Sequence, residues 1–284
     1  MTMLNLQEQA QRIADDKSLT IEERIGELLN LRNAADDNKD NDSDDFDLKK
    51  ERENADRDVI IFEVLARMIE CAPAESYDET TPLLAYTLLA EAYSASSNPR
   101  PMKIVALKAL ESFNSGEPTE YSADIIDALR RLASALKNTP FNHAYYDVLC
   151  AIVDTAETNG MNIADFKSRI ATILKLHVLM QEDRRDTPEW LNREVPKIFK
   201  PKELLDIILD PTIGHLRKDP VEYTWRWEEV YYDVEEQLEK IFEGEPRHMG
   251  FCFRYWSTKR DLLKNAYGID WCSPSEMNPR VMFD

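Results

Sequence analysis

The stretch VIIFEVLARMIE, residues 59–70, is apolar on nearly every face of a helical projection. Only Glu63, Arg67 and Glu70 interrupt it with charge. A helix that is apolar all round must be enclosed by other elements, because any face left in water would expose aliphatic side chains. We therefore expect 59–70 to be the central core helix of an all-α protein.

The sequence on both sides of this segment repeats the helical period. Thr20 and Glu23 form a capping-box pattern, and Ile21, Ile25 and Leu28 then fall on one helical face. Similar patterns predict helices over residues 81–95, 100–113, 122–136, 142–158 and 162–180. Glycine, which supplies the tight turns of β-hairpins and phosphate loops, occurs only 7 times in 284 residues. The sequence predicts an all-α fold of antiparallel helical hairpins, arranged as an α–α superhelix or a helical array.

The segment 36–58 interrupts this pattern near the N-terminus. It holds 11 acidic and 5 basic residues with only scattered apolar ones. This composition is typical of a solvated segment rather than of a packed helix. We expect an acidic loop over 36–58, with the start of a solvated helix near its end.

Four carboxylates in this segment have the spacing of a calcium site. Asp40, Asp42, Asp44 and Glu51 match positions 1, 3, 5 and 12 of an EF-hand loop, in which oxygen ligands at alternate positions wrap a hard cation. Asp45 occupies the position of the glycine that makes the sharp turn of such a loop. A calcium site and a solvated acidic loop remain alternatives, and we expect no other metal and no cofactor.

The character of the sequence changes after residue 183. Five prolines follow, at positions 188, 196, 201, 211 and 220. The sequence predicts a helical-hairpin body over 1–183 and an aromatic- and proline-rich helical module over 184–284, and leaves open whether the two pack as one unit. Within the module we expect helices over about 221–242 and 258–266, and an extended chain over 273–284.

The charge of the chain restricts its partners. A formal net charge of −19 repels polyanions, so nucleic acids and anionic membranes are disfavoured. No apolar run has the length of a membrane span, and residues 1–10 lack the pattern of a signal peptide. The four scattered cysteines, at positions 71, 150, 252 and 272, form neither a disulfide framework nor a CxxC pair. We expect a cytoplasmic protein, and a homo-oligomer stays open.

Two neighbouring predicted helices carry a family resemblance. Aromatic, leucine and small residues recur at Tyr86, Leu89, Ala90, Tyr93, Ala106, Ala109 and Leu110. This stretch, about residues 83–112, resembles a tetratricopeptide helical hairpin, in which a small residue lets the two helices approach closely. The resemblance implies a scaffold that binds peptides or proteins on a concave face, and an ordinary antiparallel helix pair is the alternative. Residues 267–284 resemble the C-terminal block of an uncharacterised bacterial protein family, to which no activity is attached.

Aromatic residues are concentrated at the C-terminal end. Residues 221–284 contain 13 of the chain's 26 phenylalanines, tyrosines and tryptophans. Exposed aromatic residues beside arginines mark binding surfaces, whereas buried ones would form the core of the module. The candidate binding residues are Trp225, Trp227, Arg247, His248, Phe251, Arg254, Tyr255, Trp256 and Trp271.

The same region leaves an enzymatic function open. An imidazole can activate a thiol, so His248 and Cys252 are candidates for a site, with Glu228 or Asp261 as the nearby carboxylate. This hypothesis requires those side chains to converge in one pocket. No signature such as HExxH or GxSxG accompanies them.

A third function, nucleic acid association, would use the local excess of basic residues. These residues are Arg247, Arg254, Lys259, Arg260 and Lys264. They must lie on one accessible face to contact phosphates. The leading hypothesis is a non-enzymatic helical scaffold or adaptor that binds another protein or a peptide.

Overall fold

The computed structural model describes residues 2–36, 48–96, 98–114, 122–183 and 187–283. These residues form helices joined by turns and loops, and no strand occurs among them, which confirms the all-α prediction. No helix in the described ranges has the length and the apolar character needed to cross a membrane. The chain divides into two compact units, Met1–Lys137 and Asn138–Asp284.

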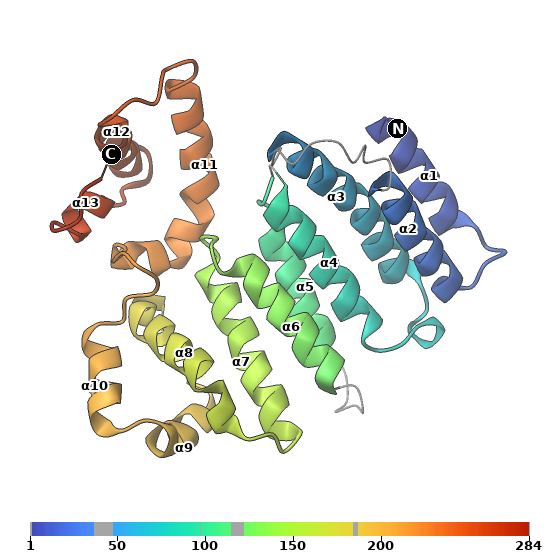
Figure 1. Ribbon diagram of the computed structural model, residues 1–284, viewed down its shortest axis with the longest axis horizontal. Coiled ribbons are helices and arrows are strands. Elements are labelled where there is room, and N and C mark those ends of the chain that lie inside the picture. Colours follow the sequence, from blue (N-terminus) through green and yellow to red (C-terminus); the bar gives the residue numbers. More distant parts are fainter. Residues whose placement is uncertain (1, 37–47, 97, 115–121, 184–186, 284) are drawn as a thin grey trace, which may run out of the picture. The chain divides into compact units, whose positions relative to one another are not determined.

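The first unit is built around one long central helix. Its helices are α1 (Met3–Asp15), α2 (Ile21–Asp36), α3 (Leu48–Cys71), α4 (Thr81–Ala95), α5 (Met102–Asn114) and α6 (Ser122–Leu136), with a short 3-10 helix η1 (Ala74–Ser76) before α4. Helix α3 packs against α1, α2 and α4, and α4 packs in turn against α5 and α6 (Figure 1). The fully buried side chains include Leu6, Leu28, Ile61, Leu65, Met102, Leu129 and Leu132. Residues 59–70 thus form part of the enclosed helix that the sequence predicts.

Helix α3 begins earlier than the sequence predicts. Residues 48–58, for which we expect an acidic loop with the start of a solvated helix near its end, are its first turns. The side chain of Ala55 is buried, and Asp58 forms a bidentate pair with Arg32 of α2, with both nitrogen–oxygen distances at 3.0 Å. Lys50, Glu51, Arg52 and Glu53 are exposed, whereas Asp58 is half-buried in this contact between helices. Of the candidate calcium ligands, Glu51 lies exposed on α3 and the three aspartates lie outside the described residues.

The second unit contains the remaining helices. These are α7 (Asn142–Thr158), α8 (Lys167–Leu179), α9 (Glu189–Ile198), α10 (Pro201–Leu209), α11 (Trp225–Ile241), α12 (Phe251–Tyr267) and α13 (Pro274–Met277), with 3-10 helices η2 (Ile163–Phe166), η3 (Gln181–Asp183) and η4 (Pro220–Tyr223). Helix α8 packs against α7, α10 and η4, and α11 packs against α12 (Figure 1). All five tryptophans, Trp190, Trp225, Trp227, Trp256 and Trp271, belong to this unit.

The unit boundary at 137/138 differs from the proline-based division at 183/184. The contacts of α8 with α10 and η4 place α7 and α8 in the same unit as the C-terminal helices. The fully buried side chains of this unit include Ile152, Ile170, Ile173 and Leu176. One apolar cluster of the unit comprises Trp227, Val234, Leu238, Leu263, Ile269 and Trp271.

Three local features of the C-terminal helices depart from the sequence prediction. The expected helix over 221–242 is interrupted at Thr224, whose hydroxyl accepts a hydrogen bond from the Trp227 N–H at 3.3 Å and caps α11. Helix α12 begins at Phe251 rather than near residue 258, so residues 251–257, between the two expected helices, are helical. The expected extended tail contains α13, which begins with a capping box between Ser273 and Glu276.

Candidate functional site

The nine candidate binding residues differ in burial. Trp227 and Trp271 are 2% and 5% exposed and stack on each other, with ring centroids 6.1 Å apart. Phe251, Tyr255 and Trp256 are half-buried, whereas the others, Trp225, Arg247, His248 and Arg254, are exposed. The aromatic residues of the C-terminal region therefore supply both a core and a surface.

Among the described residues, the contacts of the candidates in the enzymatic hypothesis do not link them to one another. His248 is exposed, and its Nδ1 lies 3.0 Å from the carbonyl oxygen of Met249. Cys252 is half-buried in the first turn of α12, and Asp261 is exposed further along that helix. Glu228 lies 4% exposed in the first turn of α11, where it contacts His143 instead. The observed contacts of these residues assemble no thiol–imidazole–carboxylate site.

The basic residues proposed to meet nucleic acid are engaged within the chain. Arg254 pairs with Glu245, Lys259 with Glu235, Arg260 with Glu276, and Lys264 with Asp270. Lys259 is also only 7% exposed. Each of these four cations therefore has a carboxylate partner, which weakens the attraction of this region for phosphate.

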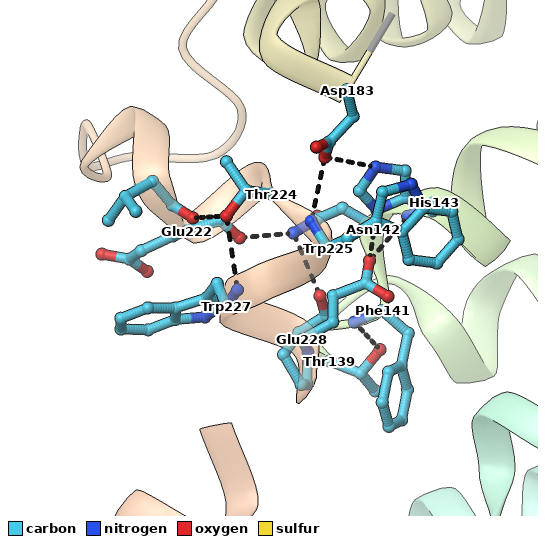
Figure 2. Close-up of polar contacts among 12 residues, drawn as sticks. Thr139, Phe141, Asn142, His143, Asp183, Glu222, Thr224, Trp225, Trp227 and Glu228 are labelled. Atoms are coloured by element: carbon cyan, nitrogen blue, oxygen red, sulfur yellow. Dashed lines mark hydrogen bonds and ion pairs between the residues drawn. The ribbon is translucent and has the colours of Figure 1, made fainter. Parts of the chain in front are cut away.

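A buried histidine lies at the centre of a polar cluster that the sequence analysis did not identify. The imidazole of His143, in the first turn of α7, has no exposed surface. Its Nδ1 lies 2.7 Å from the Glu228 carboxylate, which also accepts the backbone N–H of His143 at 2.9 Å. Its Nε2 lies 2.9 Å from Asp183 at the end of η3, and the ring stacks on Trp225 with centroids 3.7 Å apart (Figure 2).

The cluster joins three segments of the second unit. Asp183 also accepts the backbone N–H of Trp225 at 2.9 Å, so η3, α7 and α11 are all held by the same groups (Figure 2). Because the imidazole is fully buried, a substrate has no access to it. We therefore assign the cluster a structural role. The sequence placed His143 near the start of a predicted helix and Glu228 inside another, and their separation of 85 residues gave no indication that they pair.

A small pocket lies between α11, α12 and the segment that leads into α7. It has a volume of about 160 Å³ and is lined by Asn138, Thr139, Pro140, Asn142, Lys218, Glu222, Trp227, Tyr231, Tyr255, Trp256, Lys259, Trp271 and Pro274. The Lys259 ammonium lies 5.0–5.3 Å from the ring centroids of Trp227, Tyr231 and Trp271. Four of the nine candidate residues thus line one concavity.

One acidic group in this pocket has a shifted pKa. Burial raises the pKa of the Glu222 carboxyl, and the hydrogen bond from Trp271 Nε1 and the charges of Lys218 and Lys259 offset part of that rise. The bond from Trp271 to Glu222 measures 2.9 Å. The amide of Asn142 donates to the backbone carbonyl of Glu222 at 3.0 Å, which fixes the position of η4 relative to α7.

A larger groove lies in the first unit, between α2, α3, α4 and α6. Its volume is about 640 Å³. Its apolar lining consists of Leu29, Ala55, Phe62, Leu88, Ala92 and Ala95. Its polar lining consists of Arg32, Asn33, Glu51, Asn54, Asp58, Glu91 and Arg131. The bidentate pair of Arg131 with Glu91, at 2.9 and 2.5 Å, joins α6 to α4 across this groove.

No protein-family model, no curated protein and no solved structure matches the chain.

Proposed function

We propose that this chain is a non-enzymatic helical protein that binds a segment of another protein in the groove between α2, α3, α4 and α6. The groove itself is the observation that supports this proposal. Its volume of about 640 Å³ falls within the range of about 300–1,000 Å³ that binding sites occupy. It combines apolar side chains with a few polar groups, which is the composition of sites that hold and orient a ligand.

The polar groups of the groove suit a peptide chain. The amides of Asn33 and Asn54 can each donate and accept, so they can pair with the N–H and C=O groups of a peptide backbone. The apolar surface of Leu29, Phe62 and Leu88 can bury side chains of that peptide. A peptide segment therefore satisfies both parts of the lining.

The charges of the groove favour a neutral or basic segment. The lining carries two arginines, Arg32 and Arg131, against three carboxylates, Glu51, Asp58 and Glu91. Both arginines are bound to carboxylates of the groove itself. With a chain charge of −19 around it, an acidic segment would be repelled, and a segment with apolar and basic side chains would be attracted.

The tetratricopeptide resemblance agrees with this location. The hairpin over about 83–112 includes most of α4, and α4 contributes Leu88, Glu91, Ala92 and Ala95 to the groove. A helical scaffold that presents a peptide-binding concavity is what that resemblance implies. The repeat identity itself remains a prediction.

The proposal is tested by selecting peptides from a random 12-residue display library against the full chain. Ala95 is an exposed, small residue of the groove, so Ala95→Trp fills the groove without removing a buried contact. We expect the selected peptides to bind the wild type saturably and to lose about tenfold or more in affinity for Ala95→Trp, the loss typical of a blocked hot-spot pocket.

The matched control is Ala123→Trp, which introduces the same residue at an exposed site on α6 that does not line the groove. This variant should bind the selected peptides like the wild type. Equal binding to wild type and Ala95→Trp, or a failure to select any peptide, would contradict the proposal.

A further inference from the structure

The pocket of the second unit has the dimensions of a site for a single ring. Its volume of about 160 Å³ is close to the roughly 150 Å³ of an apolar cavity that holds benzene. Its walls carry the rings of Tyr255 and Trp256 and two prolines, Pro140 and Pro274. Aromatic and proline surfaces favour a planar ligand group, because rings pack in stacked or edge-to-face arrangements.

The floor of the pocket already holds a cation. The Lys259 ammonium is surrounded by Trp227, Tyr231 and Trp271 and is paired with Glu235. Rings in this arrangement attract cations, but here the chain's own lysine fills the place. A second cation would be repelled by it, so a cationic ligand is disfavoured.

The mouth of the pocket carries a different kind of cation. Lys218 is exposed, lines the pocket and forms no ion pair with any residue that the structure describes. Its neighbour Arg217, by contrast, is paired with Asp210 at 3.3 Å. The amide of Asn138, also exposed, adds a hydrogen-bond donor to the same lining.

The lining contains one carboxyl, that of Glu222, and this group does not give the pocket a net negative charge. Glu222 is occupied by the hydrogen bond from Trp271. The lining also carries two ammonium groups, Lys218 and Lys259, against this single carboxyl. The pocket therefore combines aromatic walls with an exposed ammonium and an exposed amide.

We infer that this pocket binds a ligand group that joins a planar ring to a carboxylate, with the ring against Tyr255 and Trp256 and the carboxylate at Lys218. Two sources carry this chemistry, a free aromatic acid and the C-terminal aromatic residue of a peptide. The site belongs to the second unit and does not depend on the groove proposed above.

The test is a ligand-observed NMR titration of the full chain with two anions, benzoate and N-acetylphenylalanine. Their neutral counterparts, benzamide and N-acetylphenylalanine amide, serve as matched probes. We expect each anion to bind saturably and about tenfold tighter than its amide, because the Lys218 ammonium can pair with a carboxylate but not with a neutral amide. Tighter binding of benzoate identifies a free acid as the source, and tighter binding of N-acetylphenylalanine identifies a chain terminus.

Two variants separate the contributions of the ring and the charge. Lys218→Met should reduce the affinity for each anion to that of its amide, and Trp256→Ala should abolish binding of all four probes. Lys202→Met, an exposed lysine of α10 that does not line the pocket, is the control and should bind like the wild type. Because Lys218 is exposed, its variant does not endanger the fold. Absence of saturable binding, or unchanged binding to Lys218→Met, would overturn the inference.

Discussion

At the scale of the residue, His143 determines how three segments of the second unit meet. It lies between Glu228 and Asp183, and none of its side chain is exposed. Replacing it by alanine leaves a buried carboxylate without its imidazole and opens a space beside Trp225. We expect His143→Ala to lower the free energy of unfolding by about 3 kcal/mol or more, because a buried carboxyl loses its hydrogen-bond partner and a cavity opens in its place. Guanidinium denaturation followed by circular dichroism measures the change.

The control for this prediction is His215→Ala. His215 is exposed, so its removal should change the free energy of unfolding by no more than about 0.5 kcal/mol. If His143→Ala were as stable as the wild type, the cluster would not hold the segments together.

Glu222 gives a prediction about pH. Burial raises its pKa above the ordinary value of 4.5, so the folded state binds the proton more tightly than the unfolded state does. The stability linked to this proton is fully present below about pH 4.5 and is lost as the pH rises through the folded-state pKa. Glu222→Gln keeps an acceptor for Trp271 but cannot titrate, so it should lose less stability than the wild type as the pH rises above about 4.5.

The pKa of Glu276 is shifted in the direction opposite to that of Glu222. Hydrogen bonds from Ser273 lower the pKa of its carboxyl, so its contribution to stability is lost as the pH falls. Glu276→Gln should flatten the acid side of the stability profile rather than the neutral side. Thermal unfolding at a series of pH values distinguishes the two, and a Glu222→Gln profile parallel to the wild type would refute the assignment.

At this scale the sequence predicted little of the site. Trp227, Tyr255, Trp256 and Trp271 stood out because aromatic residues are dense near the C-terminus, and all four line the pocket. Glu222 gave no signal, because its environment depends on Trp271, which lies 49 residues further along the chain. Pairings over such distances depend on packing rather than on local pattern.

At the scale of the element, two glycines allow a matched experiment. Gly268 ends α12 with φ at +62°, and a Cβ there would lie 3.3 Å from the guanidinium of Arg226. Gly26 lies inside α2, where a Cβ meets nothing within 4 Å. We expect Gly268→Ala to destabilise by about 1–2 kcal/mol, because the left-handed conformation is costly for a residue with a Cβ.

Gly26→Ala should have the opposite effect and stabilise by about 0.5–1 kcal/mol, because glycine in a helix loses more conformational freedom than alanine. Thermal unfolding of the two variants measures the loss of stability in Gly268→Ala and the gain in Gly26→Ala. Destabilisation by both would mean that space around Gly26, rather than helix propensity, limits that position.

Helix boundaries followed the sequence where a local signal existed. The capping box of Thr20 and Glu23 is present, with the Thr20 N–H donating to Glu23 at 2.7 Å, and Gly160 ends α7 with φ at +66°. The predicted starts of α3 and α12 were wrong, because contacts with other helices determine where these two helices begin. The early start of α3 includes the pairing of Asp58 with Arg32, and the first turns of α12 pack Phe251 and Tyr255 against Phe242.

At the scale of the whole molecule, each of the two compact units has its own buried side chains. The first contains Leu28, Ile61 and Leu129, and the second contains Ile173 and Leu238. We expect the separate fragments 1–137 and 138–284 each to fold and to unfold cooperatively on heating, because each can bury a core. Circular dichroism and calorimetry on the two fragments check this, and a fragment without a cooperative transition would contradict it.

The sequence predicted the fold class because helical periodicity and scarce glycine are visible along the chain. It placed a division at the prolines after residue 183, whereas the contacts of α8 with α10 and η4 run across that point. Proline marks where helices end, and it carries no information about which helices then pack together. The division into units therefore had to come from three-dimensional contacts.

The placement of every tryptophan in the second unit has a practical consequence. The aromatic residues of the first unit are tyrosines and phenylalanines alone. Tryptophan fluorescence, excited selectively, therefore reports on 138–284, and the first unit contributes none of it. Unfolding, ligand binding or loss of the His143 cluster in one half of the chain can thus be followed in the intact protein, without an added label and without interference from events in the other half.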